Sequence, residues 1–460
     1  MFTLVWRVVP SQLSSLRTFF YSLRGKANAR RFRASELCRC QNDWSALLDR
    51  TALEKICARI ESYEQEIITL QRELTAIPAL APENGGEGEH KKAEYLKQYL
   101  EASLGCREVA SYDAPDARVP TGQRPNLVAK LPGQDPANTL WIMSHMDVVP
   151  PGDLSKWEGD PWQVRVQDGK IYGRGTEDNQ QGIVSSLIAA RAFVEENLRP
   201  QRNLGLVFAA DEETGSQYGI QYVLEHHREV FQPHDFILIP DAGNEAGTLI
   251  EVAEKSIVWL KFQVLGKQTH GSTPERGVNA LRAAAHLMVQ LESLYTHYNR
   301  QDALFDPPGS TFEPTKIEAN VPNVNTIPGE QVFFCDCRLL PEYDVDEFRR
   351  HVDQICRETE SRHQVRIHVS MEQELRAAPP TPPDAPVVRA VERAVAEVAG
   401  VQARPMGIGG GTVAAFFRNA GFDTVVWATQ DETLHEPNEY ARISNIINDA
   451  KVFAHVALQA

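Results

Sequence analysis

The sequence predicts an α/β fold in which a mostly parallel sheet forms one domain and a smaller α+β domain is inserted into it. Between residues 139 and 240, short apolar runs alternate with helical stretches, which is typical of βαβ units around a parallel sheet. Residues 256–371 follow a different order, and α/β character returns after residue 376. We therefore expect the first domain to consist of residues 51–255 and 376–460.

The elements of the first domain follow from their apolar periodicity. From Thr51, apolar residues recur every three or four positions as far as Leu70, which predicts an amphipathic helix at the start. The strands and helices that follow are expected at "TLWIMS" (139–144), "GIVSSLIAARAFVEEN" (182–197), "LGLVFAA" (204–210), "YGIQYVLEHH" (218–227) and "DFILIP" (235–240). The segment 376–386, "RAAPPTPPDAP", is a linker, after which we expect the helix "VVRAVERAVAEV" and the strand "DTVVWAT".

The inserted α+β domain is expected over residues 256–371, with a ferredoxin-like arrangement. Its elements are the strand "SIVWLKFQVLG", the helix "NALRAAAHLMVQLESL", the strand "QVFFCDCRLL", the helix "VDEFRRHVDQICRE" and the strand "QVRIHVSME".

Composition and charge exclude some classes of protein. The chain of 460 residues, 42% of them hydrophobic, is long enough for a sizeable core and more than one domain. No apolar run approaches the roughly 18 residues that a membrane helix needs. The net charge of −15 argues against nucleic acid or an anionic membrane as a partner of the folded part.

The first 45 residues form a basic N-terminal extension, which we expect to be disordered. Residues 1–35 contain seven basic residues and no acidic one. This composition resembles a mitochondrial transit peptide, and an upstream extension from a misplaced start codon is the alternative. Seven cysteines without a Cys-x-x-Cys pair suggest a reducing compartment. The expected location is therefore the cytoplasm, or the mitochondrial matrix if the extension is a targeting signal.

Metal-competent side chains follow four of the predicted strands. They are His145 and Asp147, Glu212 and Glu213, Asp241, and His435. Ligands of parallel sheets bind beyond the carboxyl ends of the strands, so these side chains are expected to converge. Carboxylates crowded at such an edge repel one another unless a cation lies between them, and a divalent ion supplies that charge.

Each of these signals is weak when taken alone. A His-x-Asp sequence occurs by chance, a Glu-Glu pair is usually a solvated helix start, and a lone histidine is more often a surface residue than a ligand. Their convergence favours a metal site. Two histidines and several carboxylates fit Zn²⁺ best, with Co²⁺ or Mn²⁺ as substitutes.

Seven motifs, in order along the chain, resemble those of the dinuclear zinc amidohydrolases, a family that includes acetylornithine deacetylase, succinyl-diaminopimelate desuccinylase, aminoacylase-1, carboxypeptidase G and the carnosinases. The motifs are "SHMDVVP", "WEGDPW", "IYGRGTEDNQQG", "AADEETGS", "GKQTHGSTPERGVNA", "NVNTIPGE" and "TLHEPNEY". The resemblance covers about residues 60–458.

The resemblance implies two Zn²⁺ ions per subunit. His145 and Glu213 would bind different single ions, Asp178 would bridge the pair, and Asp241 and His435 would complete the two sites. Asp147 would hold the His145 ring from behind, as expected for a metal-bound imidazole.

The expected chemistry is amide hydrolysis with Glu212 as the general base. A water shared by the two ions would have its pKa lowered toward about 7. Glu212 would take its proton, the resulting metal-bound hydroxide would attack the amide carbonyl, and Glu212 would return the proton to the leaving amine. Asp211 would support the turn.

The inserted domain resembles the lid and dimerisation domain of the family. His270 is expected to stabilise the oxyanion, and Asn325 and Arg338 to contact substrate, with Arg338 suited to a bidentate grip on a carboxylate. Alternatively, Arg338 pairs with Asp336 or Glu342 on the surface. Outside this domain, "GIGGGT" precedes a helix without the lysine of a P-loop, so we expect Gly410, Gly411 and Thr412 to bind substrate.

The sequence departs from the family at Gln180, where a lysine is common, and this leaves the subfamily and the substrate open. The expected function is a homodimeric, metal-dependent amide hydrolase that releases an amino acid or diamino acid from an N-acetyl or N-succinyl derivative. The alternatives are a dipeptidase or carboxypeptidase with the same site, and a non-catalytic binding protein on this fold. The third would require loss of the base or of a ligand, and all those residues are present.

Overall fold

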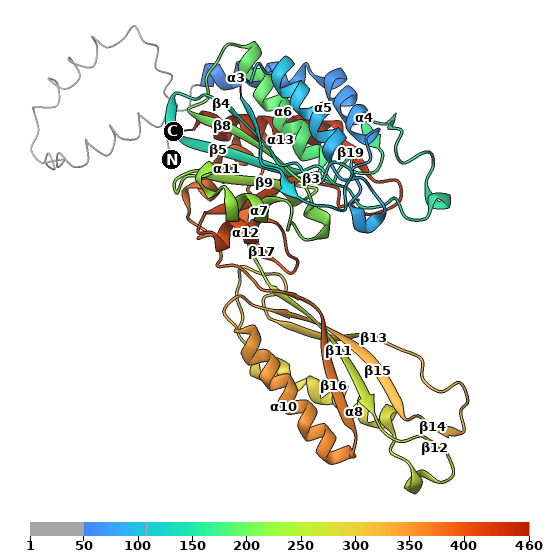
Figure 1. Cartoon of the computed structure of the whole chain (residues 1–460). Coiled ribbons are helices and arrows are strands. Elements are labelled where there is room, and N and C mark those ends of the chain that lie inside the picture. The colour runs from blue at the N-terminus through green and yellow to red at the C-terminus, as the bar shows by residue number, and fades with distance from the viewer. Residues whose placement is uncertain (1–49, 107, 460) are drawn as a thin grey trace, which may run out of the picture. The chain divides into compact units, whose positions relative to one another are not determined.

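The structure is a computed structural model that describes residues 50–106 and 108–459. The predicted N-terminal extension, residues 1–45, lies outside the described residues. An eight-stranded sheet is the centre of the larger part of the fold, and its strand order is β1-β4-β8-β5-β9-β18-β10-β17 (Figure 1). The strands are β1 (Val109–Ser111), β4 (Leu127–Leu131), β5 (Asp135–His145), β8 (Arg202–Ala209), β9 (Phe236–Asn244), β10 (Leu249–Glu254), β17 (Arg404–Ile408) and β18 (Thr424–Thr429).

The centre of this sheet is parallel. Strands β8, β5, β9 and β18 pair with one another in parallel, and so do β10 and β17, whereas the β1–β4, β4–β8 and β10–β18 pairings are antiparallel. The α/β fold with a large, mostly parallel sheet is therefore confirmed. The carboxyl ends of β5, β8 and β9 meet at one edge of the sheet, as the sequence analysis requires.

Helices cover both faces of the large sheet. One hydrophobic cluster lies between the sheet and α3, α4, α5, α6, α11 and α13, and a second lies between the sheet and α7 and α12 (Figure 1). The helices are α3 (Arg50–Glu61), α4 (Glu64–Thr75), α5 (His90–Ala102), α6 (Gln180–Glu195), α7 (Ile220–His226), α11 (Pro386–Val398), α12 (Ala414–Asn419) and α13 (Ile443–Leu458). Helix α6 has 13 buried residues among its 16, because the sheet and other helices enclose it.

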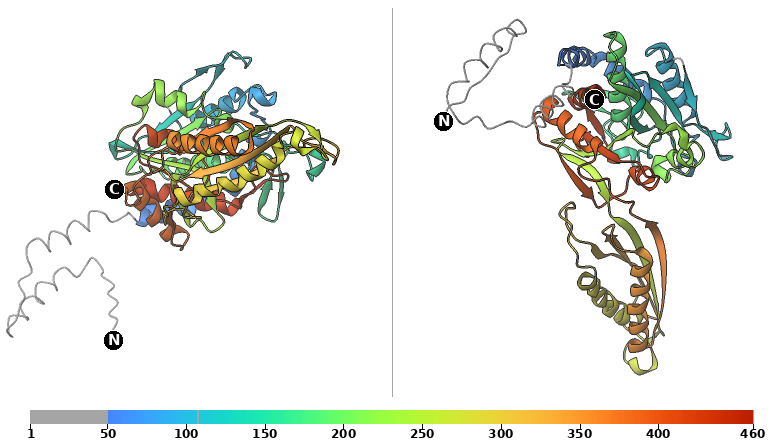
Figure 2. Two further views of the ribbon diagram at one scale, coloured as in Figure 1. Left: turned by 90° about the horizontal axis from the view of Figure 1, so that it is seen from below. Right: turned by 90° about the vertical axis from the view of Figure 1, so that its left-hand side faces the viewer.

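A second sheet, antiparallel throughout, has the order β13-β15-β11-β16. Its elements follow one another as β11 (Ser256–Leu265), α8 (Ala280–Leu291), α9 (Ser293–His297), β13 (Thr311–Ile317), β15 (Glu330–Leu339), α10 (Val345–His363) and β16 (Arg366–Leu375). Helices α8 and α10 pack on one face and share a separate hydrophobic cluster with it (Figure 2). This βαββαβ order is ferredoxin-like. The exact domain boundaries and the function of this unit as a lid stay predictions.

The remaining strands of the described residues are short and form three small sheets. They are β2 (Ala114–Pro115) with β3 (Gln123–Arg124), β6 (Arg165–Gln167) with β7 (Lys170–Tyr172) and β19 (Tyr440–Arg442), and β12 (Thr269–His270) with β14 (Thr326–Ile327).

The structure differs from the sequence prediction at the first helix. One helix was expected from Thr51 to Leu70, but the chain forms α3 and α4 with a turn at Ser62 and Tyr63. The Ser62 hydroxyl donates a hydrogen bond to the Arg59 carbonyl oxygen, and such a bond competes with the helical ladder. Apolar periodicity continues across the turn, and therefore it does not show the break.

No helix among the described residues is both long and apolar enough to cross a membrane. The described cysteines, at positions 57, 106, 335, 337 and 356, are free thiols, and the last four of them are buried. Cys335 and Cys337 point to the same face of β15 with 3.7 Å between their sulfur atoms.

Gly205 provides a test of how the large sheet packs. It lies opposite Trp141 in the β5–β8 pairing, and a Cβ atom on Gly205 would lie 2.1 Å from the indole Cε3 atom. The indole is buried and its Nε1–H donates to Asp235 at 2.8 Å, so it is not free to move aside. We expect Gly205→Ala to lower the free energy of unfolding by about 1–3 kcal/mol, as overpacking does.

Urea unfolding of the metal-free protein measures this effect. Gly159→Ala is the matched control, because a Cβ atom there meets no atom within 4 Å. Equal unfolding midpoints for the two variants would show that Trp141 yields without cost.

Candidate metal centre

Three central strands of the large sheet deliver four of the predicted site residues to one edge. His145 is the last residue of β5, Asp241 lies in β9, and Glu212 and Glu213 form a single helical turn after β8. Asp211 precedes that turn with a left-handed φ of 62°, and its carboxylate accepts a hydrogen bond from the Tyr218 N–H at 2.9 Å. This contact turns the chain so that the two glutamates face the sheet edge.

The other two predicted ligands come from loops. Asp178 lies just before α6, and the Asp178–Asn179 peptide bond is cis. His435 lies between β18 and β19, with a φ of 63°. Both loops reach the edge where β5, β8 and β9 end, because their side chains contact ligands from those strands.

Asp178 lies between the two histidines. Its Oδ1 atom is 2.9 Å from His145 Nε2, and its Oδ2 atom is 3.2 Å from His435 Nε2. The two oxygens of one carboxylate therefore face two different groups of donors. This arrangement fits the bridging position that the family resemblance implies for Asp178.

The donor atoms form two groups that share His145. One consists of His145, Asp178 and Glu213, the other of His145, Glu212 and Asp241, and within each group the donor atoms lie within 4.8 Å of one another. His435 Nε2 is 3.1 Å from Glu213 Oε2, and His145 Nε2 is 3.4 Å from Asp241 Oδ1. Ligands about 2.0 Å from a tetrahedral Zn²⁺ lie about 3.3 Å apart, so these spacings fit such an ion.

Glu212 belongs to the second group but lies farther from His145 than Asp241 does. Its Oε2 atom is 4.0 Å from His145 Nε2, compared with 3.4 Å for Asp241. This position at the margin of the donors is compatible with the predicted function of Glu212 as a base rather than a ligand.

Asp147 contacts the His145 ring from behind with its main-chain oxygen as well as its carboxylate. The His145 Nδ1 atom is 3.0 Å from the main-chain oxygen of Asp147 and 3.5 Å from its carboxylate. The buried carboxylate accepts hydrogen bonds from the main-chain N–H groups of Glu212 and Glu213, both at 3.0 Å. One residue thus fixes the imidazole with its backbone and the two glutamates with its side chain.

The charges of the centre are strongly perturbed. Hydrogen bonds with Asp178 and then Glu213 raise the pKa of His435 to about 10. Burial acts to raise the pKa of Asp178, but hydrogen bonds with His145 and His435 outweigh it and hold the pKa well below its usual range. Burial, and after it the neighbouring Asp241, raises the pKa of Glu212 well above its usual range. Protons on the histidines thus balance the carboxylates, and bound divalent ions would replace that charge.

The residues present fit a pair of metal ions. The donor set consists of two imidazoles and several carboxylates, which suits Zn²⁺, Co²⁺ or Mn²⁺. Glu213 Oε1 is buried and has no hydrogen-bond partner among the described residues, although its other oxygen contacts His435. A buried carboxylate oxygen without a partner is costly, and a metal ion would satisfy it.

Two of the residues predicted from the inserted unit lie together at one end of it. His270 in β12 pairs with Thr326 in β14, and the Gly271 N–H donates to the Asn325 carbonyl oxygen at 2.6 Å. His270 is exposed, with its Nδ1 atom 2.7 Å from the Ser272 hydroxyl. Among the described residues, His270 and Asn325 form no contact with the donor groups.

Arg338 and the glycine-rich loop are already engaged within the chain. The Arg338 guanidinium makes a bidentate pair with Asp336 at 2.6 and 2.8 Å, and its Nη1 donates to the Gly409 carbonyl oxygen at 2.7 Å. The Asp336 pairing is one of the two alternatives considered from the sequence. Thr412 donates its backbone N–H to Glu254 at 2.9 Å. Substrate binding by Gly410, Gly411 and Thr412 stays a prediction.

Sequence reasoning did not assign a function to several buried charged residues beneath the centre. Arg174, Glu177 and Glu439 are at most 2% exposed, and they connect the loops of Asp178 and His435. They lie within the quoted motifs "IYGRGTEDNQQG" and "TLHEPNEY". The only signal in the sequence was that all three residues are charged. Their hydrogen-bond partners in the other loop are about 250 residues away, so the sequence did not show the pairing. Gln180 is also buried, and its Oε1 accepts a hydrogen bond from Thr75 at 2.8 Å.

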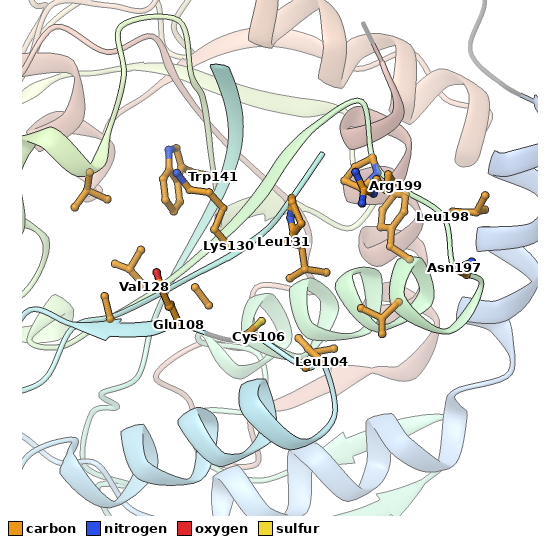
Figure 3. Close-up of a pocket in the computed structure, with 18 of the residues that line it drawn as sticks. Leu104, Cys106, Glu108, Val128, Lys130, Leu131, Trp141, Asn197, Leu198 and Arg199 are labelled. Carbon is orange, nitrogen blue, oxygen red and sulfur yellow. The ribbon is translucent and has the colours of Figure 1, made fainter. Parts of the chain in front are cut away.

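A cavity of about 1210 Å³ lies at the β1 edge of the large sheet (Figure 3). Lys130 and Leu131 from β4, Trp141 from β5, and Leu198 and Arg199 after α6 are among the residues that line it. None of the predicted metal ligands is among its described lining residues, so this cavity is separate from the metal centre.

Comparison with known proteins agrees with this geometry. Residues 141–459 match the family described as peptidase family M20/M25/M40. An uncharacterized metallohydrolase of Methanococcus maripaludis is 39% identical over 417 residues, which are 86% of this chain and 100% of the relative. Succinyl-diaminopimelate desuccinylase of Nitratiruptor is 25% identical, over 81% of this chain and 94% of the relative.

A solved structure with a similar fold is human carnosine dipeptidase 1. It has a TM-score of 0.66 at 20% identity, and the similarity covers 88% of this chain and 98% of that one.

Metal content tests the bridging position of Asp178. We expect two ions per chain at saturation and one ion in Asp241→Ala. We expect Asp178→Ala to lose both ions, because the Asp178 carboxylate contacts both His145 and His435. Elemental analysis after dialysis against Zn²⁺ measures the stoichiometry. Glu436→Ala, which removes an exposed acid next to His435, is the control. One remaining ion in Asp178→Ala would show that Asp178 belongs to a single site.

Proposed function

Because the chain belongs to peptidase family M20/M25/M40, we propose that it is a dinuclear zinc amide hydrolase that releases an amino acid or diamino acid from its N-acyl derivative. That it is a metallohydrolase follows from family membership. The two-ion centre is supported by one observation above all: the Asp178 carboxylate presents one oxygen to His145 and the other to His435. The metal, the acyl group and the leaving amine are part of the proposal.

Bound metal ions would act as Lewis acids on the scissile carbonyl and lower the pKa of a water molecule. In the proposed reaction Glu212 accepts a proton from the attacking water, a C–O bond forms and the amide C–N bond breaks. Glu212 then transfers the proton to the leaving nitrogen, which gives a carboxylic acid and an amine, and transfer of the acid proton to the amine leaves a carboxylate and an ammonium group. Asp147 keeps Glu212 in place through the 3.0 Å hydrogen bond from the Glu212 N–H.

The acyl substrate is supported by similarity to a desuccinylase along 81% of the chain. A dipeptidase is the second candidate, because the fold is also that of carnosine dipeptidase 1. Both reactions hydrolyse an amide bond with the same residues. They differ in the groups that flank the bond, so the residues outside the metal centre decide between them.

A substrate screen tests the proposal directly. The Zn²⁺- or Co²⁺-loaded protein is assayed against N-acetyl amino acids, N-succinyl diamino acids and dipeptides. Hydrolysis of the acyl compounds with the highest kcat/KM supports the first candidate, and preference for dipeptides supports the second. A loaded protein that hydrolyses none of the three classes would contradict the proposal.

Glu212→Gln tests the base. The substitution keeps the size of the side chain and removes its capacity to accept a proton, so we expect kcat to fall by about 10²–10⁴-fold while both ions are retained. Metal analysis of the same sample separates loss of the base from loss of a ligand. A kcat close to the wild-type value in the fully loaded variant would remove Glu212 from the mechanism.

We also propose that the protein acts as a homodimer, a state in which a partner copy supplies His270. One support is an exposed apolar stripe on α8, where Leu281 is 40% and Val289 63% exposed. Ile317, at the open edge strand β13, is 56% exposed. A second copy that packs against α8 and β13 would cover these side chains and extend the sheet.

The geometry of the inserted sheet supports the same arrangement. Arg338 on β15 lies opposite Ile257, near the start of β11, in the strand register. Its side chain also donates a hydrogen bond to the Gly409 carbonyl oxygen of the glycine-rich loop. His270 follows the opposite end of β11, beyond Leu265. Eight residues of strand span about 26 Å, so His270 lies far from the end that contacts Gly409. This separation supports the proposal that His270 reaches the site of a partner copy.

Mixed dimers test whether His270 acts in trans. Glu212→Ala and His270→Ala subunits are each expected to be nearly inactive. In a dimer of the two, one site carries both substitutions and the other is intact, so random mixing should restore about a quarter of wild-type sites. Activity is measured after co-expression, with confirmed heterodimer content. Confirmed heterodimers without activity would show that His270 acts in its own chain, and a monomer in solution would contradict the dimer.

A further inference from the structure

Two buried glutamates link the loops that carry Asp178 and His435. Each glutamate comes from one loop and accepts hydrogen bonds from the backbone of the other. Glu439 is 0% exposed and Glu177 is 1% exposed. We refer to these two residues and their backbone donors as the reciprocal clamp.

Glu439 holds the loop of Asp178. Its carboxylate accepts hydrogen bonds from the backbone N–H groups of Gly175 at 2.9 Å, Glu177 at 3.0 Å and Asp178 at 3.1 Å. Arg174 Nη1 also donates to it, at 2.6 Å. Glu439 therefore has a cationic partner as well as three backbone donors.

Glu177 holds the loop of His435. Its carboxylate accepts hydrogen bonds from the Asp431 N–H at 2.7 Å, the Thr433 N–H at 2.5 Å and the Thr433 hydroxyl at 2.8 Å. No lysine or arginine among the described residues forms an ion pair with Glu177. A buried carboxylate without a cation depends on these charge-assisted bonds, so the loop position is tightly specified.

His435 requires such support more than the other ligands do. Its side chain is 51% exposed, whereas that of His145 is 1% exposed in the sheet core. It lies on an irregular loop with left-handed φ, where no strand pairing fixes the backbone. The position of its imidazole is therefore set by the contacts of residues 431–439, and Glu177 makes three of them.

We propose that Glu177 is a positioning residue for the metal ligand His435, acting through the backbone of Asp431 and Thr433. The inference rests on the proposed metal centre but not on the substrate. Outer contacts of this kind typically change metal affinity by about 10–100-fold when removed. In Glu177→Gln one carboxylate oxygen becomes an NH₂ group, which meets a backbone N–H or hydroxyl donor instead of accepting from it.

Titration with Co²⁺, followed by its visible absorption, tests the proposal without an activity assay. We expect wild-type protein to bind two ions and Glu177→Gln to bind one of them about 10–100-fold more weakly, namely the ion for which His435 would be a ligand together with Asp178 and Glu213, the two carboxylates that its Nε2 atom contacts. Glu432→Gln is the matched control, because it removes an exposed carboxylate from the same loop and should titrate like wild type.

A double-mutant cycle separates positioning from general stability. Once His435 is replaced by alanine, Glu177→Gln should cause no further loss of Co²⁺ affinity, because the two residues act along one path. Thr433→Val removes one hydroxyl donor from the same contact and should shift the affinity in the same direction by a smaller factor. If Glu177→Gln does not fold, Thr433→Val takes its place in the Co²⁺ titration.

Three outcomes would overturn the inference. The first is wild-type Co²⁺ affinity in Glu177→Gln or, where that variant does not fold, in Thr433→Val. The second is a lower urea midpoint of the metal-free variant with unchanged affinity of the folded protein, which would mean a purely structural function. The third is an additive loss in the His435→Ala background. Wild-type protein that binds no Co²⁺ would contradict both this inference and the proposed metal centre, whereas binding without hydrolysis of any tested substrate would contradict only the proposed function.

Discussion

Mutual repulsion among carboxylates at one edge of a buried sheet is the constraint on which the rest of the structure depends. Asp178, Glu212, Glu213 and Asp241 lie within a few ångströms of two imidazoles. Hydrogen bonds with Asp178 and Glu213 raise the pKa of His435, which favours a proton on its imidazole beside these carboxylates. Such a cluster persists only if the backbone holds each group against repulsion, and divalent ions convert that repulsion into binding energy.

Carboxylates behind the centre provide this support by accepting hydrogen bonds from the backbone. Asp147 accepts from the N–H groups of Glu212 and Glu213, Glu439 from the loop of Asp178, and Glu177 from the loop of His435. In every case a buried acid fixes the chain at or next to a predicted metal ligand. The acidic residues of the motifs therefore fall into two classes, those predicted to bind or serve the metals and those that accept hydrogen bonds from the backbone.

The parts that could be predicted from the sequence are those in which chemistry and periodicity coincide. His145, Glu212, Glu213 and Asp241 were predicted to converge because they follow or end buried strands, and parallel strands end at one edge. The bridging position of Asp178 came only from the family resemblance, because a loop has no period that fixes its place. The Ser62 turn, the β10 and β17 strands and the reciprocal clamp were not anticipated. Each depends on a side-chain contact or a pairing between segments that are distant in the sequence.

The predicted site residues are divided between the two sheets. The predicted metal ligands and the predicted base Glu212 belong to the large sheet and its loops. His270, which is predicted to stabilise the oxyanion, and the predicted substrate contacts Asn325 and Arg338 belong to the inserted unit, and Gln180 is buried within the larger unit. Under the proposed function, a change in the inserted sheet would alter the predicted substrate contacts without altering the predicted metal ligands. A desuccinylase and a dipeptidase are both similar to this chain, so a shared metal centre would not distinguish the two substrates, and the residues outside it are needed to identify the substrate.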